Sequence, residues 1–398
     1  MKAVFRNALI SKRAVLNIYW MKKIDCMLGA LTTLVLPAPS SKLNPTFISG
    51  ILLIRPGGIG DAVHLIPIIH ALKHSYPSTT IEILAEKRNA SVFSLCPEVD
   101  RVFLYDRPVE FLQVFRRRYD VIIDTEQWHR LSAIVARLIR SNVKIGFATN
   151  ERRRMFTHGI DYAHDDSEME SFAHLLRPLD ISCIPDSDKP FLSVPPASAN
   201  RAQELLAGIT EPFVALFPGA SIPERRWGAE RFRELAGRLL SAGMNVVVVG
   251  GGEDREAGDE IAQVGGLNLA GRTTLVETAA ILQRSTLLVS GDSGVLHLAV
   301  GLGIPTVSLF GPGIAAKWAP WGPRHAVINL NLPCSPCTRF GTTPPCPIHA
   351  RCIQEVSVDR VYEQVESLRA VPDIFTKRFQ SRRGDARWTR DELHEREC

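Results

Sequence analysis

The sequence feature that most constrains the fold is a glycine-rich turn between a short apolar run and a helical segment. The run Ile51–Ile54 predicts a buried parallel strand, and Leu65–Leu72 predicts a helix. The turn between them, residues 55–64, has the sequence RPGGIGDAVH. In α/β proteins such a turn brings the backbone close to a ligand. The carboxylate of Asp61 would repel a dinucleotide pyrophosphate there, so we interpret Asp61 as a base directed into a cleft.

Apolar runs alternate with helical segments along most of the chain, which predicts parallel sheets with helices on both faces. The first half has predicted strands at Ile51–Ile54, Thr80–Leu84, Val102–Tyr105, Val121–Ile123 and Val143–Phe147, and a predicted helix at Leu131–Arg140. The second half has predicted strands at Phe213–Phe217, Asn245–Val249, Leu287–Ser290 and Thr306–Phe310, and predicted helices at Ala229–Ser241, Asp254–Gln263, Leu275–Leu282 and Val295–Gly301.

The 398 residues are enough for two α/β domains, each with its own core. We expect an N-terminal Rossmann-like domain over residues 49–184, a proline-rich linker over 185–198 and a C-terminal Rossmann-like domain over 199–371. Residues 372–398 are strongly charged, and we expect a mostly disordered tail. Ligands of open α/β sheets bind at the carboxyl ends of the strands, so we expect the two domains to face each other across a binding cleft.

Residues 1–48 form a basic, apolar extension. Its lysines and arginines outnumber its acids, and the apolar run Met27–Leu36 is shorter than the roughly 20 residues of a membrane span. A secretory signal fits poorly because charges at Lys22, Lys23 and Asp25 interrupt the region. We expect an interfacial helix on an anionic membrane surface, with a disordered leader as the alternative.

The net charge of +5 and the pI near 8.8 are mildly basic. This balance suits an anionic substrate or membrane surface, and ordinary surface charge explains it equally well. The basic residues are too few and too scattered to predict nucleic-acid binding.

Four glycine turns follow the strands of the second half. They are Phe217-Pro218-Gly219-Ala220, Gly250-Gly251-Gly252-Glu253-Asp254, Ser290-Gly291-Asp292-Ser293-Gly294 and Phe310-Gly311-Pro312-Gly313. Helix N-termini and glycine turns bind diphosphates through backbone N–H groups. Arg225 and Arg226 are positioned to neutralise a diphosphate, whereas Asp292 and Glu253 suit sugar hydroxyls, which donate hydrogen bonds to carboxylates. A single such turn is more often only a tight turn, but four in one half predict a nucleotide-sugar site.

The sequence from Ile51 to about Leu368 resembles glycosyltransferase family nine, the ADP-heptose:lipopolysaccharide heptosyltransferases. The matching stretches, in the family's order, are Ile51–Ile69, Tyr119–Ala136, Phe217–Trp227, Val247–Gly258, Asn268–Gly271, Ser290–His297 and Phe310–Pro312. The resemblance implies a GT-B fold, with an acceptor-binding N-terminal half and a donor-binding C-terminal half. It also implies an inverting, metal-independent transfer to the inner core of lipopolysaccharide in a Gram-negative cell.

The resemblance places the catalytic base at Asp61 and the family's donor motif at Asp292, Ser293, Gly294 and His297. A basic residue near the donor phosphates falls on Arg225, where many members have lysine. The full predicted donor site is Gly219, Arg225, Arg226, Gly250, Glu253, Asp292, Ser293, Gly294 and His297. No cofactor is expected beyond the ADP-sugar donor, and the expected partners are ADP-heptose and a lipid A–core acceptor at the inner leaflet.

The predicted acceptor-binding residues are Arg55, Gly60, His64 and Arg152. A packing role for His64 and a solvated loop for residues 152–154 remain alternatives. Asp124, which follows a predicted strand, is interpreted as structural. We expect a cytoplasmic monomer, either free or peripheral on the inner face of the membrane.

Four of the eight cysteines cluster near the C-terminus, at Cys334, Cys337, Cys346 and Cys352. Their composition suggests a structural zinc site, although the spacing departs from paired C-x-x-C motifs. A structural metal or disulfide, and reduced inert thiols, both remain open.

Three other functions compete with the transferase. An NAD-dependent oxidoreductase is disfavoured because Val63 stands where the dinucleotide fingerprint needs glycine or alanine. A nucleotide-sugar epimerase of the same fold would bind the same kind of donor without an acceptor, and a non-catalytic sugar-binding module would bind without transfer. Fold alone does not separate these functions.

Overall fold

The structure is a computed structural model and describes residues 25, 29–39, 47–339 and 342–370. The charged segment 372–398 and most of the 1–48 extension lie outside the described residues, so the expectations for them remain predictions. None of the helices in the described ranges is long and apolar enough to cross a bilayer.

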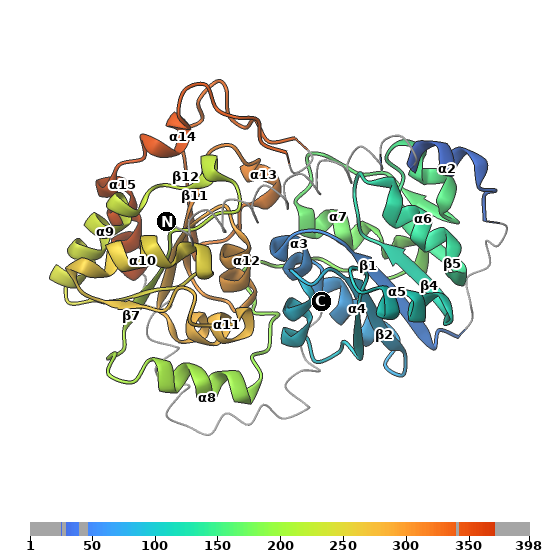
Figure 1. Cartoon of the computed structure of the whole chain (residues 1–398), viewed down its shortest axis with the longest axis horizontal. Coiled ribbons are helices and arrows are strands. Elements are labelled where there is room, and N and C mark those ends of the chain that lie inside the picture. The colour runs from blue at the N-terminus through green and yellow to red at the C-terminus, as the bar shows by residue number, and fades with distance from the viewer. Residues whose placement is uncertain (1–24, 26–28, 40–46, 340–341, 371–398) are drawn as a thin grey trace, which may run out of the picture.

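The N-terminal half contains a parallel sheet of six strands (Figure 1). In spatial order they are β3 (Arg101–Leu104), β2 (Thr80–Ala85), β1 (Gly50–Arg55), β4 (Arg118–Asp124), β5 (Arg140–Phe147) and β6 (His158–Ile160). The helices of this half are α3 (Ile59–His64), α4 (Ile66–Ser75), α5 (Pro108–Phe115), α6 (Arg130–Leu138) and α7 (Glu168–His174), with short 3₁₀ helices η2 (Ala90–Leu95), η3 (Asn150–Met155) and η4 (Arg177–Leu179).

The C-terminal half repeats this plan with a second parallel six-stranded sheet. Its spatial order is β12 (His325–Asn329), β11 (Thr306–Phe310), β10 (Leu287–Gly291), β7 (Phe213–Phe217), β8 (Asn245–Val248) and β9 (Leu267–Asn268). The helices are α8 (Pro196–Leu205), α9 (Ala229–Ser241), α10 (Arg255–Ile261), α11 (Leu275–Arg284), α12 (Gly294–Gly301), α13 (Ala315–Trp318), α14 (Arg351–Gln354) and α15 (Val358–Arg369), with 3₁₀ helices η5 (Pro223–Arg225), η6 (Gly252–Asp254) and η7 (Ala262–Val264).

Both sheets have the Rossmann strand order 3-2-1-4-5-6 when the strands of each half are counted from its own first strand. The order reverses between β1 and β4 in the first sheet and between β7 and β10 in the second. These reversal points are where open α/β sheets bind ligands. The predicted pair of Rossmann-like doubly wound domains is therefore confirmed.

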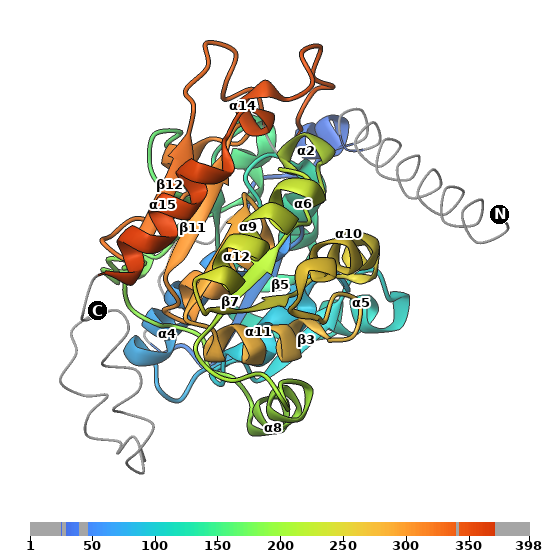
Figure 2. The ribbon, with the colours of Figure 1, turned by 90° about the vertical axis from the view of Figure 1, so that its left-hand side faces the viewer.

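Side chains alternate along the strands, so each sheet buries apolar residues on both faces. In the first sheet, Leu52 and Ile54 pack toward α5 and α6, whereas Ile51 and Leu53 pack toward α3, α4 and α7. In the second sheet, the outer core packs against α9 and α15, which Figure 2 shows on the same side of the sheet.

The inner faces of the two halves share one hydrophobic core. Residues of α3 and α4 belong to the same buried cluster as residues of α11 and α12 and of strands β7 and β10. Figure 1 shows α3 beside α12 at the centre of the molecule. The turn that follows β1 is therefore held directly against the second half.

The proline-rich linker is attached to both halves. The N–H groups of Phe191 and Leu192 donate to the Gly301 carbonyl, at 2.8 and 2.9 Å, and the Ser193 N–H donates to the Leu95 carbonyl at 2.8 Å. The final residues of the predicted linker are helical, because α8 begins at Pro196 and proline is well tolerated in a first helical turn.

The described part of the extension packs on the N-terminal half. The buried Asp25 carboxylate accepts a hydrogen bond from the Leu131 N–H at 2.8 Å, at the start of α6. The short helix α2 (Ala30–Val35) lies beside α6 and η3. Leu36, just after α2, packs against the cluster of the first sheet that contains Leu52 and Ile54.

Candidate active site

The turn after β1 holds Asp61 in a defined orientation. Gly57 has a φ of +111°, which favours glycine, and Gly58 is the N-cap of α3. Its N–H donates to Oδ2 of Asp61 at 3.2 Å. The Asp61 side chain is 22% exposed, so one carboxylate can bond the backbone and still be reached by a second molecule.

Arg55 supports this carboxylate from inside the domain. Its guanidinium is almost fully buried and lies 3.9 Å from Asp61 Oδ1 and 3.4 Å from Glu126 Oε2. It also donates to the carbonyls of Pro56 and Thr125, at 2.5 and 2.9 Å. Arg55, predicted to bind acceptor, is thus placed to orient Asp61, with its donors directed at the protein.

Helices α3 and α12 meet across the two halves at two glycines. A Cβ added to Gly60 would lie 2.5 Å from Cδ2 of His297, and one added to Gly294 would lie 2.7 Å from Cβ of Ile59. Neither distance is compatible with a real side chain. The two predicted site glycines therefore permit a helix-to-helix contact that holds the Asp61 turn beside the donor motif.

The same junction contains a buried histidine pair. Nε2 of His64 and Nδ1 of His297 are 2.8 Å apart, with the rings edge to face. Trp318 stacks on His64 with ring centroids 5.7 Å apart. Burial, and then the neighbouring ring, hold the pKa of His64 well below its usual range. Burial and the charge of Arg225 lower the pKa of His297 to about 3, so both rings are neutral near pH 7.

Arg225 and Asp292 form a buried ion pair in the C-terminal half. Nη1 of Arg225 lies 2.7 Å from Oδ2 of Asp292, and their side chains are 16% and 6% exposed. Burial raises the pKa of Asp292, Arg225 opposes the rise, and the charge of Asp61 adds to it. A Cβ at Gly313 would overlap Asp292 Oδ2, and one at Gly291 would lie 2.9 Å from the Arg225 carbonyl. The pair is therefore enclosed by glycine turns.

Ser293 caps α12, since its hydroxyl accepts the Leu296 N–H at 3.2 Å. Helix α12 therefore begins two residues after Asp292, and its N-terminus lies beside the Arg225–Asp292 pair.

The turns after β7 and β8 converge on Asp254, which the sequence analysis did not select. A Cβ at Gly219 or Gly250 would overlap atoms of Asp254, and its Oδ2 accepts the Gly251 N–H at 2.9 Å. Glu253 is exposed beside this turn. The available signal for Asp254 was an acid at the end of a glycine turn and at the first position of a predicted helix.

Arg226 is directed at its own loop. Its Nε and Nη2 both donate to the Ala220 carbonyl, at 2.9 and 2.8 Å. These hydrogen bonds hold the segment that carries Arg225 in place, so Arg226 supports the predicted donor site without pointing into it.

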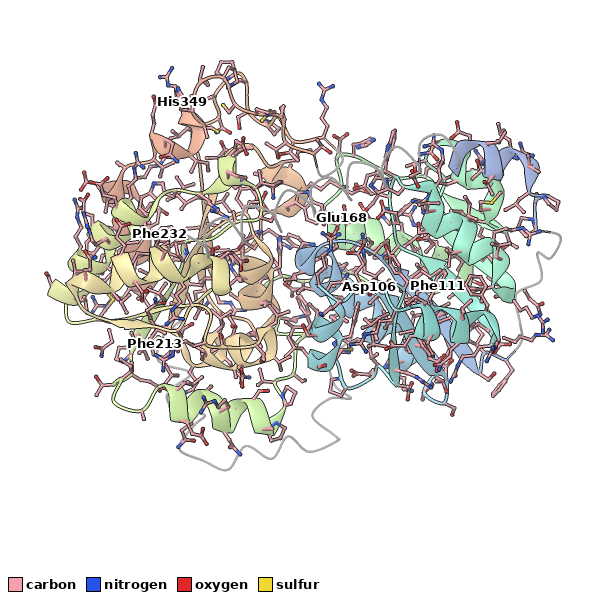
Figure 3. The ribbon with its side chains drawn as sticks, viewed as in Figure 1. Asp106, Phe111, Glu168, Phe213, Phe232 and His349 are labelled. Atoms are coloured by element: carbon pink, nitrogen blue, oxygen red, sulfur yellow. The ribbon has the colours of Figure 1, made fainter. Side chains whose placement is uncertain are left out.

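A second buried ion pair crosses between the halves, and sequence reasoning missed it. Lys317 of α13 lies 3.4 Å from Oε2 of Glu168, the α7 residue labelled in Figure 3. Nζ of Lys317 also donates to the carbonyls of Ala163 and Asp166, both at 3.0 Å. Tyr162 donates to Glu168 at 2.7 Å. Burial raises the pKa of Glu168, Lys317 opposes the rise, and Asp61 adds to it, so the Asp61 carboxylate acts on acids in both halves. A lysine in the otherwise apolar segment AAKW was the one signal.

Arg152 lies inside the N-terminal half. Its side chain is fully buried and its Nη2 is 2.8 Å from Oδ2 of Asp124, which is also fully buried. The structural interpretation of Asp124 therefore agrees with its position. A direct acceptor contact by Arg152 is inconsistent with this burial, and the exposed members of the run are Arg153 and Arg154.

The four clustered cysteines are free thiols of graded exposure. Cys334 is exposed, Cys337 and Cys346 are half-buried, and Cys352 is buried. Burial, and then the neighbouring cysteines, raise the pKa of Cys337 and of Cys352. The four sulfurs do not form a compact donor group; within the described ranges, the group whose donor atoms all lie within 4.8 Å is His70, Cys96 and Glu98.

Residues 110–346, more than half of the chain, match the family model of "Glycosyltransferase family 9 (heptosyltransferase)". The chain belongs to glycosyltransferase family 9. It is therefore a transferase, as the resemblance implied, and family membership argues against the oxidoreductase, epimerase and binding-module alternatives. The match begins after the Asp61 turn, so it does not test the assignment of the base.

Curated relatives cover similar parts of this family 9 chain. Lipopolysaccharide heptosyltransferase 3 of Escherichia coli is 28% identical over 290 residues, which are 66% of this chain and 83% of the relative. Lipooligosaccharide heptosyltransferase 2 of Haemophilus influenzae is 25% identical over 308 residues, which are 70% and 88%.

Solved structures support the family 9 fold. A glycosyltransferase family 9 protein from Veillonella parvula has a TM-score of 0.70 at 19% identity, covering 82% of this chain and 99% of that one. The E. coli ADP-heptose LPS heptosyltransferase II has a TM-score of 0.64 at 24% identity, covering 80% and 98%. The predicted GT-B architecture is therefore confirmed.

Proposed function

We propose that this family 9 enzyme transfers a heptose from ADP-heptose to the inner core of lipopolysaccharide, with inversion at the anomeric carbon. The names of the curated relatives support the donor sugar and the acceptor class. The observation that carries the mechanism is the position of Asp61. It is partly exposed, and it lies across the α3–α12 contact from the Arg225–Asp292 pair.

In this mechanism Asp61 takes the proton from the acceptor hydroxyl as its oxygen attacks the anomeric carbon. The new carbon–oxygen bond forms on one face of the anomeric carbon. The bond from this carbon to the diphosphate, on the opposite face, breaks and releases ADP. Arg55 and the Gly58 N–H hold the carboxylate in place during this step. Attack from the side opposite the leaving group is what produces inversion.

The charge of the departing ADP is balanced by protein groups. Arg225 supplies a guanidinium, and the start of α12 at Ser293 and Gly294 supplies a helix N-terminus. Asp292, and Glu253 on its exposed turn, accept hydrogen bonds from hydroxyls of the sugar and ribose. Gly219 and Gly250, which have no side chains, let the backbone approach the diphosphate. We propose that transfer proceeds without a divalent cation on this basis.

On the acceptor side, Gly60 and His64 shape the surface beside Asp61. Arg55 and Arg152 act from inside the domain, the first by orienting Asp61 and the second by fixing the loop that carries Arg153 and Arg154. We propose that the two exposed arginines, rather than Arg152, approach anionic groups of the acceptor.

We infer that the enzyme works as a monomer at the cytoplasmic face of the membrane, where a lipid-linked acceptor would be presented. Helix α2 exposes Leu31, Leu34 and Val35, and η3 beside it exposes Arg153 and Arg154. An apolar surface flanked by cations suits an anionic leaflet.

A structural zinc ion held by Cys334, Cys337, Cys346 and Cys352 remains part of the proposal. Four thiolates are a donor set that zinc prefers, but the free thiols must move closer together to bind one ion. Its test is the zinc content of the purified protein before and after Cys337→Ser.

The deciding experiment combines ADP-heptose with heptose-deficient core lipid and measures both ADP and the mass of the lipid. We expect ADP release that depends on the acceptor, lipid heavier by one heptose, and full rates in excess EDTA. An epimerase would change the donor without acceptor. ADP release independent of acceptor, or unmodified lipid, would overturn the proposed reaction, and loss of activity in EDTA would overturn metal independence alone.

A further inference from the structure

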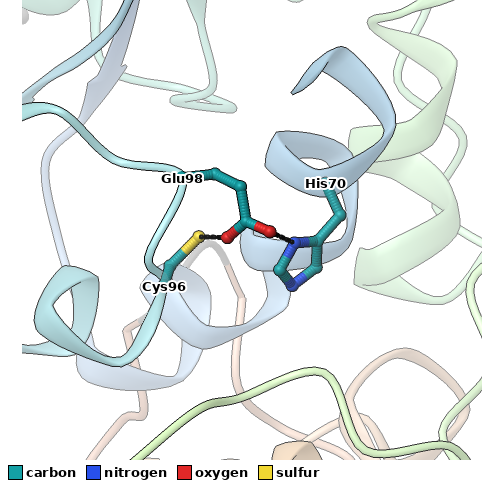
Figure 4. A group of neighbouring side chains, drawn as sticks. All are labelled: His70, Cys96 and Glu98. Atoms are coloured by element: carbon teal, nitrogen blue, oxygen red, sulfur yellow. Dashed lines mark hydrogen bonds and ion pairs between the residues drawn. The ribbon is translucent and has the colours of Figure 1, made fainter. Parts of the chain in front are cut away.

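Outside the active site, three side chains with metal-binding donors converge on the inner face of the N-terminal half. His70 comes from α4, Cys96 follows η2, and Glu98 lies two residues further on. Their donor atoms all lie within 4.8 Å of one another (Figure 4). The figure shows the Glu98 carboxylate between the thiol and the imidazole.

The backbone fixes which nitrogen of His70 faces the cluster. Nε2 lies 2.8 Å from the carbonyl oxygen of Phe191. Because a carbonyl only accepts, Nε2 carries a hydrogen. Nδ1 is then directed at Glu98 Oε1, at 3.1 Å. Histidines that bind metals through one nitrogen characteristically donate the other N–H to a carbonyl or carboxylate in this way.

Two protons hold the metal-free cluster together. Nδ1 must be protonated to approach a carboxylate, and the Cys96 thiol donates to Glu98 Oε2 at 3.4 Å. Hydrogen bonding to His70, opposed by burial, lowers the pKa of Glu98 to about 2. Burial raises the pKa of the Cys96 thiol. The group thus contains an imidazolium, a carboxylate and a neutral thiol, and its net charge is zero.

A divalent cation can replace both protons without changing this charge. Loss of one proton from Nδ1 and one from Sγ leaves a neutral imidazole, a carboxylate and a thiolate, whose total charge of minus two balances the ion. Nitrogen, sulfur and carboxylate oxygen together are the donors that Zn²⁺ accepts in tetrahedral sites. The His70 and Glu98 side chains are 29% and 31% exposed, which provides an entry path and a position for water as fourth ligand.

We propose that His70, Cys96 and Glu98 form a zinc site, separate from the four-cysteine segment. The bound ion would hold the proline-rich linker, residues 185–198, against the N-terminal half. Phe191, which accepts from His70, and Leu192 both donate to Gly301 of the C-terminal half, and Ser193 donates to Leu95 beside Cys96. The role of the site would be to join α4 and η2 to the linker, with a water completing the coordination of the ion.

The test uses the full chain, stripped with a chelator and titrated with Zn²⁺ against a chromophoric competitor, with proton release recorded at pH 7. The variants are His70→Gln, Cys96→Ser and Glu98→Gln. Glutamine at position 70 keeps an N–H for the Phe191 carbonyl, and Glu98→Gln keeps the volume. Cys183→Ser is the matched cysteine control, and Cys337→Ser isolates the four-cysteine segment.

We expect each of the three variants to bind one zinc equivalent fewer than wild type. If a variant still binds that zinc ion, its affinity should be weaker than that of wild type by more than roughly 10–100-fold. Loss of a residue that only supports a ligand costs roughly 10–100-fold, so a larger loss identifies a ligand. Cys183→Ser and Cys337→Ser should retain the site, and wild type should release about two protons per ion bound there. Far-UV circular dichroism identifies variants that misfold, and Glu98→Gln then carries the test. Equal zinc binding by wild type and all folded variants would overturn the proposal and leave a proton-bridged ion pair.

Discussion

At the scale of single residues, Asp61 should be separable from donor binding. It belongs to the N-terminal half, whereas the turns proposed to bind the donor belong to the other half. We expect Asp61→Asn to lower kcat by about 10²–10⁴-fold, because loss of a general base typically costs that much. The affinity for ADP, measured by calorimetry, should change little. Near wild-type turnover in Asp61→Asn would remove Asp61 from the chemistry.

Arg225 should contribute to the binding of ADP through its charge. We expect Arg225→Ala to weaken ADP binding by about 1.5–3 kcal/mol, more at low salt, because a hydrogen bond to a charged group is lost. The variant also leaves Asp292 buried without its partner, so stability should fall as well.

The double variant Arg225→Ala/Asp292→Asn separates these two effects. It should recover stability, because no lone carboxylate remains, while its ADP affinity stays low. Arg225→Lys should lie between wild type and alanine, since it keeps the charge without the planar fork. Unchanged ADP affinity in Arg225→Ala would exclude Arg225 from the donor site.

The residues of the candidate site were partly predictable from the sequence. Asp61, Asp292 and His297 follow strands with glycine turns, and local sequence carries that signal. The Lys317–Glu168 pair joins residues 149 positions apart in the sequence, and it exists only because the fold brings Lys317 of α13 to Glu168 and Ser171 of α7. The burial of Arg152 could not be predicted from the sequence either. A run of arginines predicts exposed side chains, and only the folded structure shows that Arg152 pairs with the buried Asp124.

At the scale of helices, the α3–α12 contact should not tolerate a methyl group. We expect Gly60→Ala to lower the free energy of unfolding by about 1–3 kcal/mol, because its Cβ overlaps His297 and overpacked cores lose about that much. The matched control is Gly237→Ala on α9, where nothing lies within 4 Å of the new Cβ. It should stabilise by about 0.5–1 kcal/mol through helix propensity. Chemical denaturation measures both, and equal effects would contradict the tight contact.

The buried histidine pair should make the junction sensitive to acid. The pKa values of His64 and His297 are lowered in the folded protein, so below about 6.5 the unfolded chain binds more protons. Their contribution to stability is therefore complete above that pH and falls as the pH drops below it. Between that pH and its folded-state pKa of about 3, the His297 imidazole contributes a slope of about 1.4 kcal/mol per pH unit. The Tm of His297→Gln, measured between pH 7 and 5, should fall less steeply than that of wild type. Parallel slopes would contradict the assignment of neutral rings.

The sequence predicted central elements better than edge elements. The ranges expected for β7, β11 and α9 match the structure residue by residue, because long apolar runs or strong helical periodicity mark them. Three of the four outermost strands, β6, β9 and β12, were not predicted, whereas β3 was; β6 and β9 are only three and two residues long. Helix α7 was also missed, although Ser167 and Glu170 form a capping box at its start.

At the scale of the whole molecule, the extension should control access to membrane-bound acceptor. Six of its seven basic residues lie within 1–24, whereas Asp25 and α2 are packed on the N-terminal half. Deletion of residues 1–24 should therefore leave a folded enzyme with full activity on a soluble acceptor fragment. Binding to anionic vesicles should weaken, since each basic residue near the surface contributes about 1 kcal/mol.

Sedimentation with vesicles of different anionic content and salt concentration tests the extension. Vesicle binding that is unchanged by the deletion would contradict an anchor within 1–24. In that case, changing Leu31 and Leu34 to serine tests the exposed surface of α2 instead.

The contact between Gly60 and His297, matched by that between Gly294 and Ile59, has a consequence for protein engineering. Each half carries a glycine that a side chain of the other half contacts closely, so the two halves are matched to each other at this junction. A chimera that joined the acceptor half of one family member to the donor half of another would need both helices from the same parent. The crossover points of such a chimera should therefore be placed outside α3 and α12, so that the two helices are exchanged together.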